Sequence, residues 1–227
     1  MRKKVSEKTM ADAFEKYLSI GDSSFQCFSY YAREVQCEQG IPDFIGLRNL
    51  RPSSAEGLEL VAIPRHLKTV SLSVLSLLQY NAPRTSGYIF SRIGHSLSQT
   101  VQAIDYLQCM GLILSENSGH SFVLNSSKLP KFNLTAFELK TSDWRRALFQ
   151  SSQYKAFASQ VYAVFPPQLG KTIDINVEKF RKRNIGIMLF DTDELKAELI
   201  FRPMLKRPVS KRHYYYALTQ LAAETAS

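Results

Sequence analysis

The sequence contains little cysteine. Its three cysteines, Cys27, Cys37 and Cys109, form no CxxC pair, and no two histidines stand at the spacing of zinc ligands. An odd number of scattered cysteines predicts neither a disulfide framework nor a structural zinc site. We therefore expect reduced thiols.

Long apolar runs are also missing. No stretch approaches the roughly 18 uncharged apolar residues that a transmembrane helix needs. The N-terminal residues MRKKVSEKTMADAFEKYL lack the apolar centre and the small-residue cleavage site of a signal peptide. We expect a soluble, cytoplasmic protein with no membrane partner.

Basic residues outnumber acidic ones. Lysine and arginine total 29 against 20 aspartates and glutamates, which gives a net charge of +9. The basic residues concentrate at Arg145-Arg146, at 181–183 and at 202–212, and the last of these stretches contains no acid. Clustered positive charge attracts polyanions, so we predict DNA as a partner. No segment joins a basic face to a strong apolar face, as membrane-surface helices do.

Two separate parts of the chain alternate strand and helix patterns. Residues 6–20 predict a helix, and 25–36 and 41–47 predict strands. Later, a strand ends at 140, a helix begins near Trp144, strands follow at 160–166, 185–191 and 195–201, and a basic helix lies within 173–183. This alternation predicts an α/β fold with a mixed central sheet flanked by helices.

The intervening segment has a different pattern. Residues 48–59 have the composition of a linker, helices are predicted at 67–80, 86–93 and 96–110, and a hairpin joins 112–115 to 121–124. This order resembles a winged helix-turn-helix domain. The sequence thus divides into a discontinuous core, 1–60 and 129–201, an inserted winged helix at 61–128, and a basic tail at 202–227.

The third helix of a winged helix enters the DNA major groove, and the hairpin lies along the backbone. The resemblance therefore implies DNA contacts by Ser98, Gln99 and Gln102, with Arg92 nearby. Arg145 and Arg146 of the core are further candidates. Because the face of the third helix is only weakly basic, a protein-binding role for this domain stays open.

The strand that ends in Glu138-Leu139-Lys140 contains candidate catalytic residues. The period-two rule puts Glu138 and Lys140 on one face of the strand and Leu139 on the other. A second carboxylate beside them would suit a hard divalent cation, and Asp43 is the candidate. An acid in an apolar strand is costly unless it is paired or bound to metal. Asp43 is either such an acid or a turn residue after Pro42.

Pro42-Asp43, Glu138-Leu139-Lys140 and a following helix with Gln150 and Tyr154 resemble the PD-(D/E)xK nuclease superfamily. The resemblance implies that Asp43, Glu138 and the backbone carbonyl of Leu139 bind Mg²⁺ or Mn²⁺. It implies that Lys140 orients or activates the attacking water and that Gln150 and Tyr154 face the same pocket. An acid on the first helix contributes in many members, and Glu15 is the candidate.

We therefore predict a Mg²⁺-dependent DNA endonuclease of restriction, mobile-element or repair processes, acting as a homodimer or with a partner subunit. One alternative is a non-enzymatic DNA-binding or assembly protein on a degenerate nuclease fold, and RNA binding or cleavage is another. The assignment of Asp43 to this site also requires that residues 48–131 are an insertion outside the core sheet. If residues 48–131 belong to the core sheet, Asp43 loses its role.

Overall fold

The computed structural model describes residues 5–20, 28–49, 64, 67–129 and 131–224. Most of the predicted linker at 48–59 and the start of the strand predicted at 25–36 lie outside these residues. The chain divides into two compact units. The first comprises Met1–Leu50 and Phe132–Val209, and the second comprises Arg51–Lys131 and Ser210–Ser227.

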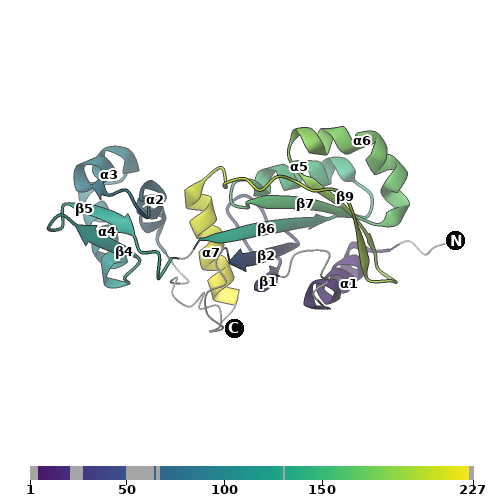
Figure 1. Ribbon diagram of the computed structural model, residues 1–227, viewed down its shortest axis with the longest axis horizontal. Coiled ribbons are helices and arrows are strands. Elements are labelled where there is room, and N and C mark those ends of the chain that lie inside the picture. Colours follow the sequence, from purple (N-terminus) through teal and green to yellow (C-terminus); the bar gives the residue numbers. More distant parts are fainter. Residues whose placement is uncertain (1–4, 21–27, 50–63, 65–66, 130, 225–227) are drawn as a thin grey trace. The chain divides into compact units, whose positions relative to one another are not determined.

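The first unit is built on a mixed sheet with the strand order β1-β2-β6-β7-β8-β9 (Figure 1). The strands are β1 (Tyr30–Arg33), β2 (Phe44–Asn49), β6 (Phe132–Leu139), β7 (Gln160–Phe165), β8 (Gly186–Asp191) and β9 (Lys196–Phe201). β2 is antiparallel to both of its neighbours, β1 and β6, whereas β6, β7 and β8 run parallel and β9 returns antiparallel. The parallel neighbours are joined by crossover helices, as parallel pairing requires.

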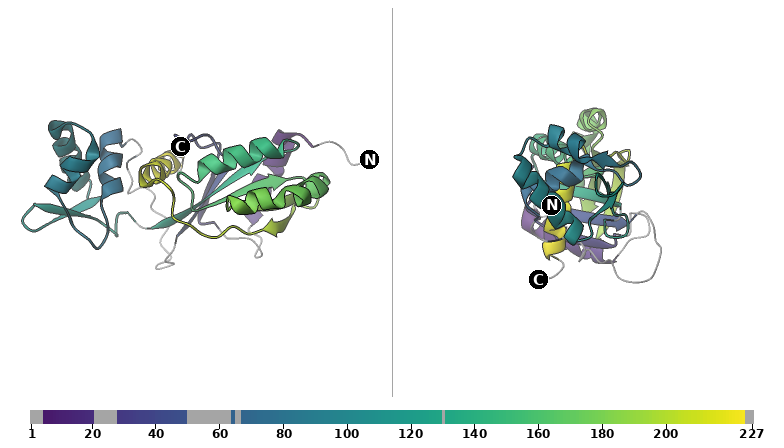
Figure 2. Two further views of the ribbon diagram at one scale, coloured as in Figure 1. Left: turned by 90° about the horizontal axis from the view of Figure 1, so that it is seen from above. Right: turned by 90° about the vertical axis from the view of Figure 1, so that its left-hand side faces the viewer.

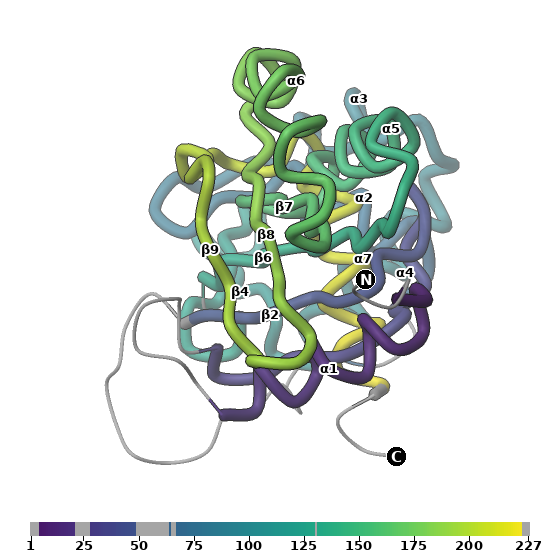
Figure 3. Tube along the Cα trace, turned by 90° about the vertical axis from the view of Figure 1, so that its right-hand side faces the viewer, coloured from purple at the N-terminus to yellow at the C-terminus, as the bar shows by residue number. Residues whose placement is uncertain are grey.

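Helices cover both faces of this sheet (Figure 3). α1 (Glu7–Ile20) lies on one face, and α5 (Trp144–Tyr154) and α6 (Gly170–Lys182) lie on the other. Asp143 caps α5 by accepting a hydrogen bond from the Arg146 N–H at 3.0 Å. The predicted α/β fold with a mixed sheet between helices is confirmed.

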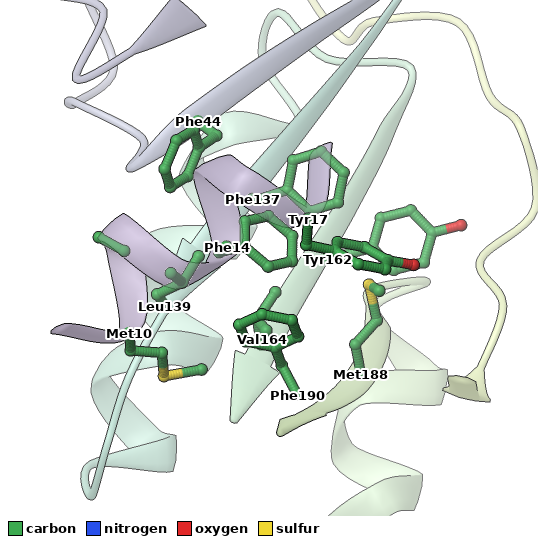
Figure 4. Close-up of a cluster of buried hydrophobic side chains, with 11 residues drawn as sticks. Met10, Phe14, Tyr17, Phe44, Phe137, Leu139, Tyr162, Val164, Met188 and Phe190 are labelled. Carbon is green, nitrogen blue, oxygen red and sulfur yellow. The ribbon is translucent and has the colours of Figure 1, made fainter. Parts of the chain in front are cut away.

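Alternation along the strands supplies two apolar layers. Phe137, Tyr162 and Phe190 pack with Met10 and Phe14 of α1 (Figure 4). On the opposite face, the layer under α5 and α6 contains Trp144, Ala147, Ala163, Phe165, Phe180 and Ile187. Phe137 and Leu139, at the end of β6, belong to the layer under α1, so the side chain of Glu138 between them points to the opposite face.

The second unit contains a smaller sheet with the order β3-β5-β4. Its elements are α2 (Thr69–Leu77), β3 (Arg84–Thr85), α3 (Ser86–Ile93), α4 (Leu97–Cys109), β4 (Ile113–Glu116), β5 (Ser121–Leu124) and α7 (Lys211–Glu224). Thr85 and Ser96 cap α3 and α4 through their hydroxyls. Gly94 takes the left-handed conformation, φ 69°, that ends α3. The predicted helices and the hairpin lie within three residues of their predicted bounds, and the largest difference is the end of α2 at Leu77 instead of 80.

None of the described helices combines the length and the apolar character needed to cross a membrane.

The C-terminal residues do not form the single basic tail that the sequence suggests. Residues up to Val209 belong to the first unit, whereas α7 belongs to the second. α7 buries Tyr215, Leu218 and Leu221, and the hydroxyls of Tyr80 and Tyr215 are hydrogen bonded. The basic run that precedes α7 dominates the composition there, and so it hides the helical spacing of these apolar residues.

Candidate active site

The register of β2 and β6 brings the two predicted carboxylates together. Phe44 pairs with Phe137 in this antiparallel ladder, so one further step places Asp43 opposite Glu138. Side chains of directly opposed residues point to the same face, with Cβ atoms about 5 Å apart. The Leu139 N–H also donates to Asp43 Oδ2 at 2.6 Å. In the described residues, no strand of the second unit joins this sheet.

Both carboxylate oxygens of Glu138 have a partner. Lys140 Nζ lies 2.8 Å from Oε1, and the Tyr154 hydroxyl donates to Oε2 at 2.6 Å. Glu138, Lys140 and Tyr154 are 1%, 8% and 1% exposed. The structure therefore places Lys140 and the predicted helical Tyr154 at the same buried carboxylate.

The loop before Asp43 completes the support of Tyr154. The Tyr154 hydroxyl lies 3.1 Å from the Ile41 carbonyl oxygen. Gly40 has φ 120°, and a Cβ built on it would lie 3.1 Å from the Tyr154 ring. Only glycine adopts this conformation readily and leaves room for the ring. Gly40 is a supporting residue that sequence reasoning missed, although the glycine just before Pro42-Asp43 was its visible signal.

The electrostatics reflect two acids beside one lysine. Burial, and then the charge of Glu138, raise the pKa of Asp43 from 3.8 to about 6, against the opposing effects of the Leu139 N–H and Lys140. Burial lowers the pKa of Lys140, but the hydrogen bond and charge of Glu138 outweigh it, so this pKa lies above its ordinary value. Burial and Glu138 also raise the pKa of Tyr154. Tyr154 is therefore a neutral donor at physiological pH.

The acid of α1 at this cluster is Glu7 rather than Glu15. Glu7 Oε2 lies 3.8 Å from Lys140 Nζ. Glu15 instead forms an ion pair with Arg33 at 3.5 Å, and Arg33 forms a second ion pair with Asp12 at 2.8 Å. Glu7 stands at the first residue of the helix, where the chain enters the layer above β6. No local sequence feature distinguishes these acids, because only packing decides which end of α1 meets Lys140.

Gln150 lies one helical turn before Tyr154 on α5, and residues four apart share a face. Its Oε1 is buried and has no hydrogen-bond partner in the described part of the chain. An acceptor without a partner is costly to bury. Gln150 is therefore available to a ligand, although no contact joins it to Glu138 or Lys140.

Cys37 stands near this site but cannot serve as a nucleophile. It is buried, and its backbone exchanges two hydrogen bonds with Gly40. Burial raises the pKa of its thiol to about 12. Because only the thiolate is strongly nucleophilic, Cys37 shapes the loop before Asp43 and takes no chemical role.

The predicted nucleic-acid contacts lie in both units. Arg145 and Arg146 are exposed in the first turn of α5, and the Arg145 guanidinium lies 4.6 Å from the centre of the Trp144 ring. In the second unit, Ser98, Gln99 and Gln102 are exposed on α4, and the Arg92 guanidinium lies 5.9 Å from the Tyr88 ring centre.

Comparisons were made with protein-family models, curated proteins and solved structures. None of them matches this chain.

The described residues contain no group of three or more His, Cys, Asp and Glu side chains arranged for a metal ion. Two adjacent carboxylates are sufficient for Mg²⁺, because this ion keeps several waters and commonly takes only one or two carboxylates from the protein. The raised pKa of Asp43 has burial and then the nearby charge of Glu138 as its leading causes. A divalent cation between the two acids would relieve that repulsion, so the donor set fits such an ion.

Proposed function

We propose that this protein is a metal-dependent DNA endonuclease whose site contains Asp43, Glu138 and Lys140. The observation that carries the proposal is the cross-strand opposition of Asp43 and Glu138, with Lys140 Nζ 2.8 Å from the Glu138 carboxylate. Glu138 and Lys140 at the end of β6, with Asp43 just before the neighbouring strand β2, suit the hydrolysis of a phosphodiester.

The connectivity of the first unit supports this proposal. α1 precedes the antiparallel strands β1, β2 and β6, and α5 then leads to β7, parallel to β6. This is the order that the resemblance to PD-(D/E)xK nucleases implies, with Asp43 and Glu138 on neighbouring strands. We propose that the first unit is a restriction-endonuclease-like core.

Asp43, Glu138 and the carbonyl of Leu139 would hold Mg²⁺ or Mn²⁺. When bound, the ion would neutralise charge that develops on the phosphate oxygens. Lys140 Nζ, which also donates to the Leu139 carbonyl at 3.2 Å, is positioned to orient a water and to stabilise negative charge beside Glu138. Tyr154 keeps Glu138 in a single orientation by donating to its Oε2.

The second unit supports DNA as the substrate. Its order of α2, β3, α3, α4 and the β4–β5 hairpin is the one that the resemblance to a winged helix implies. Arg84 and Arg92 flank the Tyr88 ring at 5.0 and 5.9 Å and present cations on α3 and β3. We propose that these arginines contact phosphates and that Ser98, Gln99 and Gln102 of α4 face the bases.

One observation favours a non-enzymatic assembly protein as the second candidate. α4 contains no lysine or arginine and exposes apolar side chains, with Leu97 at 63% and Tyr106 at 42%. Such a face suits a protein partner better than a phosphate backbone. On this reading, the Glu138–Lys140 pair would be a structural ion pair only.

Incubation of the pure protein with supercoiled plasmid and Mg²⁺ or Mn²⁺ tests the proposal. We expect nicking or linearisation that EDTA abolishes and that Lys140→Ala slows by about a hundredfold or more. Lys171→Ala, which removes an exposed lysine of α6, is the matched control and should cut normally. If Lys140→Ala cuts as fast as the wild type, the assigned site is wrong. Duplex binding without cleavage under either ion would favour the second candidate.

A further inference from the structure

A basic extended segment crosses the first unit between β9 and α7. Residues 202–209, here called the basic strap, follow β9 as the yellow-green coil of Figure 2. The strap is held mainly through its backbone. Its anchors are Gln160 Nε2 to Pro203 O (3.0 Å), Asn184 Nδ2 to Met204 O (2.8 Å), Met204 N to Asn184 Oδ1 (2.8 Å), Lys206 N to Ser159 O (3.1 Å) and Val209 N to Lys155 O (3.0 Å).

These anchors leave most strap side chains in solvent. Met204, Leu205 and Val209 are 64%, 54% and 81% exposed, and Lys206 and Arg207 are also exposed. Hydrophobic burial therefore does not explain why this segment is fixed. Ordering a chain costs about 1–2 kcal/mol per residue in backbone entropy. Because the segment is fixed through its backbone and its side chains point into solvent, these side chains are accessible to a binding partner.

Cations from three elements converge at the strap. Lys155 caps the C-terminus of α5 and donates to the Arg183 carbonyl oxygen at 2.8 Å. Burial, and then the charges of Lys206 and Arg183, lower the pKa of Lys155. Among the described residues, none of Lys155, Arg183, Lys206 and Arg207 forms an ion pair with a carboxylate. Like charges held together without acids are unfavourable until an anion binds.

The strap lies at the opposite ends of the parallel strands from the candidate site. Its partners Ser159 and Gln160 begin β7, whereas the site stands at the end of β6. α5 carries Arg145 in its first turn and Lys155 at its C-cap, directly after Tyr154, whose hydroxyl donates to Glu138. At 1.5 Å per residue these positions are about 15 Å apart along the helix. Phosphates of one DNA strand repeat about every 3.4 Å along the axis, so this distance covers roughly four or five of them.

We propose that the basic strap, together with Lys155 and Arg183, binds the phosphate backbone of duplex DNA at the opposite ends of the parallel strands from the candidate active site. The identity of the polyanion rests on the proposed function, while the convergence of cations does not. The strap would hold the duplex through phosphates about four or five nucleotides away from those near Arg145. It would thereby add affinity without reading sequence.

The salt dependence of binding tests this proposal. A fluorescent duplex is titrated with wild-type protein, with Lys206→Ala/Arg207→Ala, and with the control Lys16→Ala/Lys196→Ala, all in EDTA so that no cleavage occurs. The control removes the same charge from exposed lysines of α1 and β9. Alanine keeps the backbone N–H that anchors Lys206, and Trp144 fluorescence checks that the first unit stays folded.

Each lost phosphate contact lowers the slope of log K against log salt by about 0.9 in magnitude. We expect the strap variant to lose about 1.8 from the slope. The wild type then weakens about twelvefold more than this variant between 50 and 200 mM salt. The control should keep the wild-type slope. An unchanged slope in the strap variant, or an equal change in the control, overturns the proposal.

Two further outcomes separate the possibilities. If the strap variant loses binding to phosphatidylserine vesicles but keeps the wild-type duplex slope, the strap is a lipid-surface site and the proposal is wrong. If the slope changes as expected but no metal supports plasmid cleavage, the strap binds DNA as proposed and the proposed nuclease activity is wrong. Binding and cleavage are thus judged by separate measurements.

Discussion

Replacing Asp43 with asparagine should stabilise the metal-free protein while abolishing its proposed activity. Asp43 is partly buried beside Glu138, and its pKa is raised from 3.8 to about 6. The folded protein therefore binds more protons than the unfolded chain between about pH 4 and 6. Stability contributed by this group is present below about pH 4 and is lost as pH rises to about 6. Above pH 7 the ionised carboxylate carries its full cost.

The size of this cost follows from the shift in pKa. A change of one pKa unit corresponds to about 1.4 kcal/mol, so the shift of Asp43 sets an upper value near 3 kcal/mol. Asp43 is not fully buried, and water that reaches it reduces this value. Asparagine is neutral, and its carbonyl oxygen can still accept the hydrogen bond from the Leu139 N–H. We therefore expect Asp43→Asn to raise the free energy of unfolding at pH 8 by about 1–3 kcal/mol.

Urea unfolding in EDTA, followed by tryptophan fluorescence, measures this effect. Trp144 is the single tryptophan of the chain and is buried in the first unit, so its emission reports the unfolding of that unit. The gain from Asp43→Asn should shrink towards zero at pH 4.5. Asp174→Asn, which neutralises an exposed carboxylate of α6, is the control and should change stability little at either pH.

Magnesium provides the complementary measurement. Ten millimolar Mg²⁺ should stabilise the wild type, because an ion that binds only the folded state adds RT ln(1 + [L]/Kd). The same ion should stabilise Asp43→Asn less, since this variant lacks one of the two carboxylates proposed to bind the ion. The reasoning is refuted if Asp43→Asn is less stable than the wild type at pH 8 in EDTA, or if its gain is the same at pH 4.5.

Two further predictions concern the groups around Glu138. Tyr154→Phe removes the hydrogen-bond donor to Glu138 Oε2. Plasmid cleavage should slow by about 10- to 100-fold, and the free energy of unfolding in urea should fall by about 1–3 kcal/mol. An unchanged cleavage rate would show that Tyr154 does not position Glu138. Glu7→Gln should lower the cleavage rate, because Glu7 lies near Lys140, whereas Glu15→Gln should leave it unchanged, because Glu15 pairs with Arg33. If only Glu15→Gln lowers the rate, Glu7 is not the acid that acts with Lys140.

Local patterns predicted most of the elements. The bounds of α3, Ser86–Ile93, agree with the sequence prediction because Thr85 and Gly94 are strong local start and stop signals. β7 and β8 are buried on both faces, and their continuous apolar runs made them recognisable. Short-range chemistry decides such elements, so the sequence displays them directly.

The surroundings of Glu138 were only partly predictable. Period-two alternation put Glu138 and Lys140 on one face, and a four-residue spacing put Gln150 and Tyr154 on another. That Asp43 opposes Glu138 depends on the register of β2 and β6, two strands separated in the sequence by residues 51–131 of the second unit. Register is set by the buried faces of both strands, which no local window contains.

The sequence by itself therefore determined most of the elements, the α/β class and the residue types available for chemistry, because propensity, periodicity and capping act over a few neighbouring residues. The tertiary structure alone decided which acids meet. It brought Glu7 rather than Glu15 to Lys140, fitted Gly40 against Tyr154, and divided the basic C-terminal residues between an anchored strap and α7. Each of these depends on contacts between residues distant in the chain, whose free energies appear only when the layers pack together.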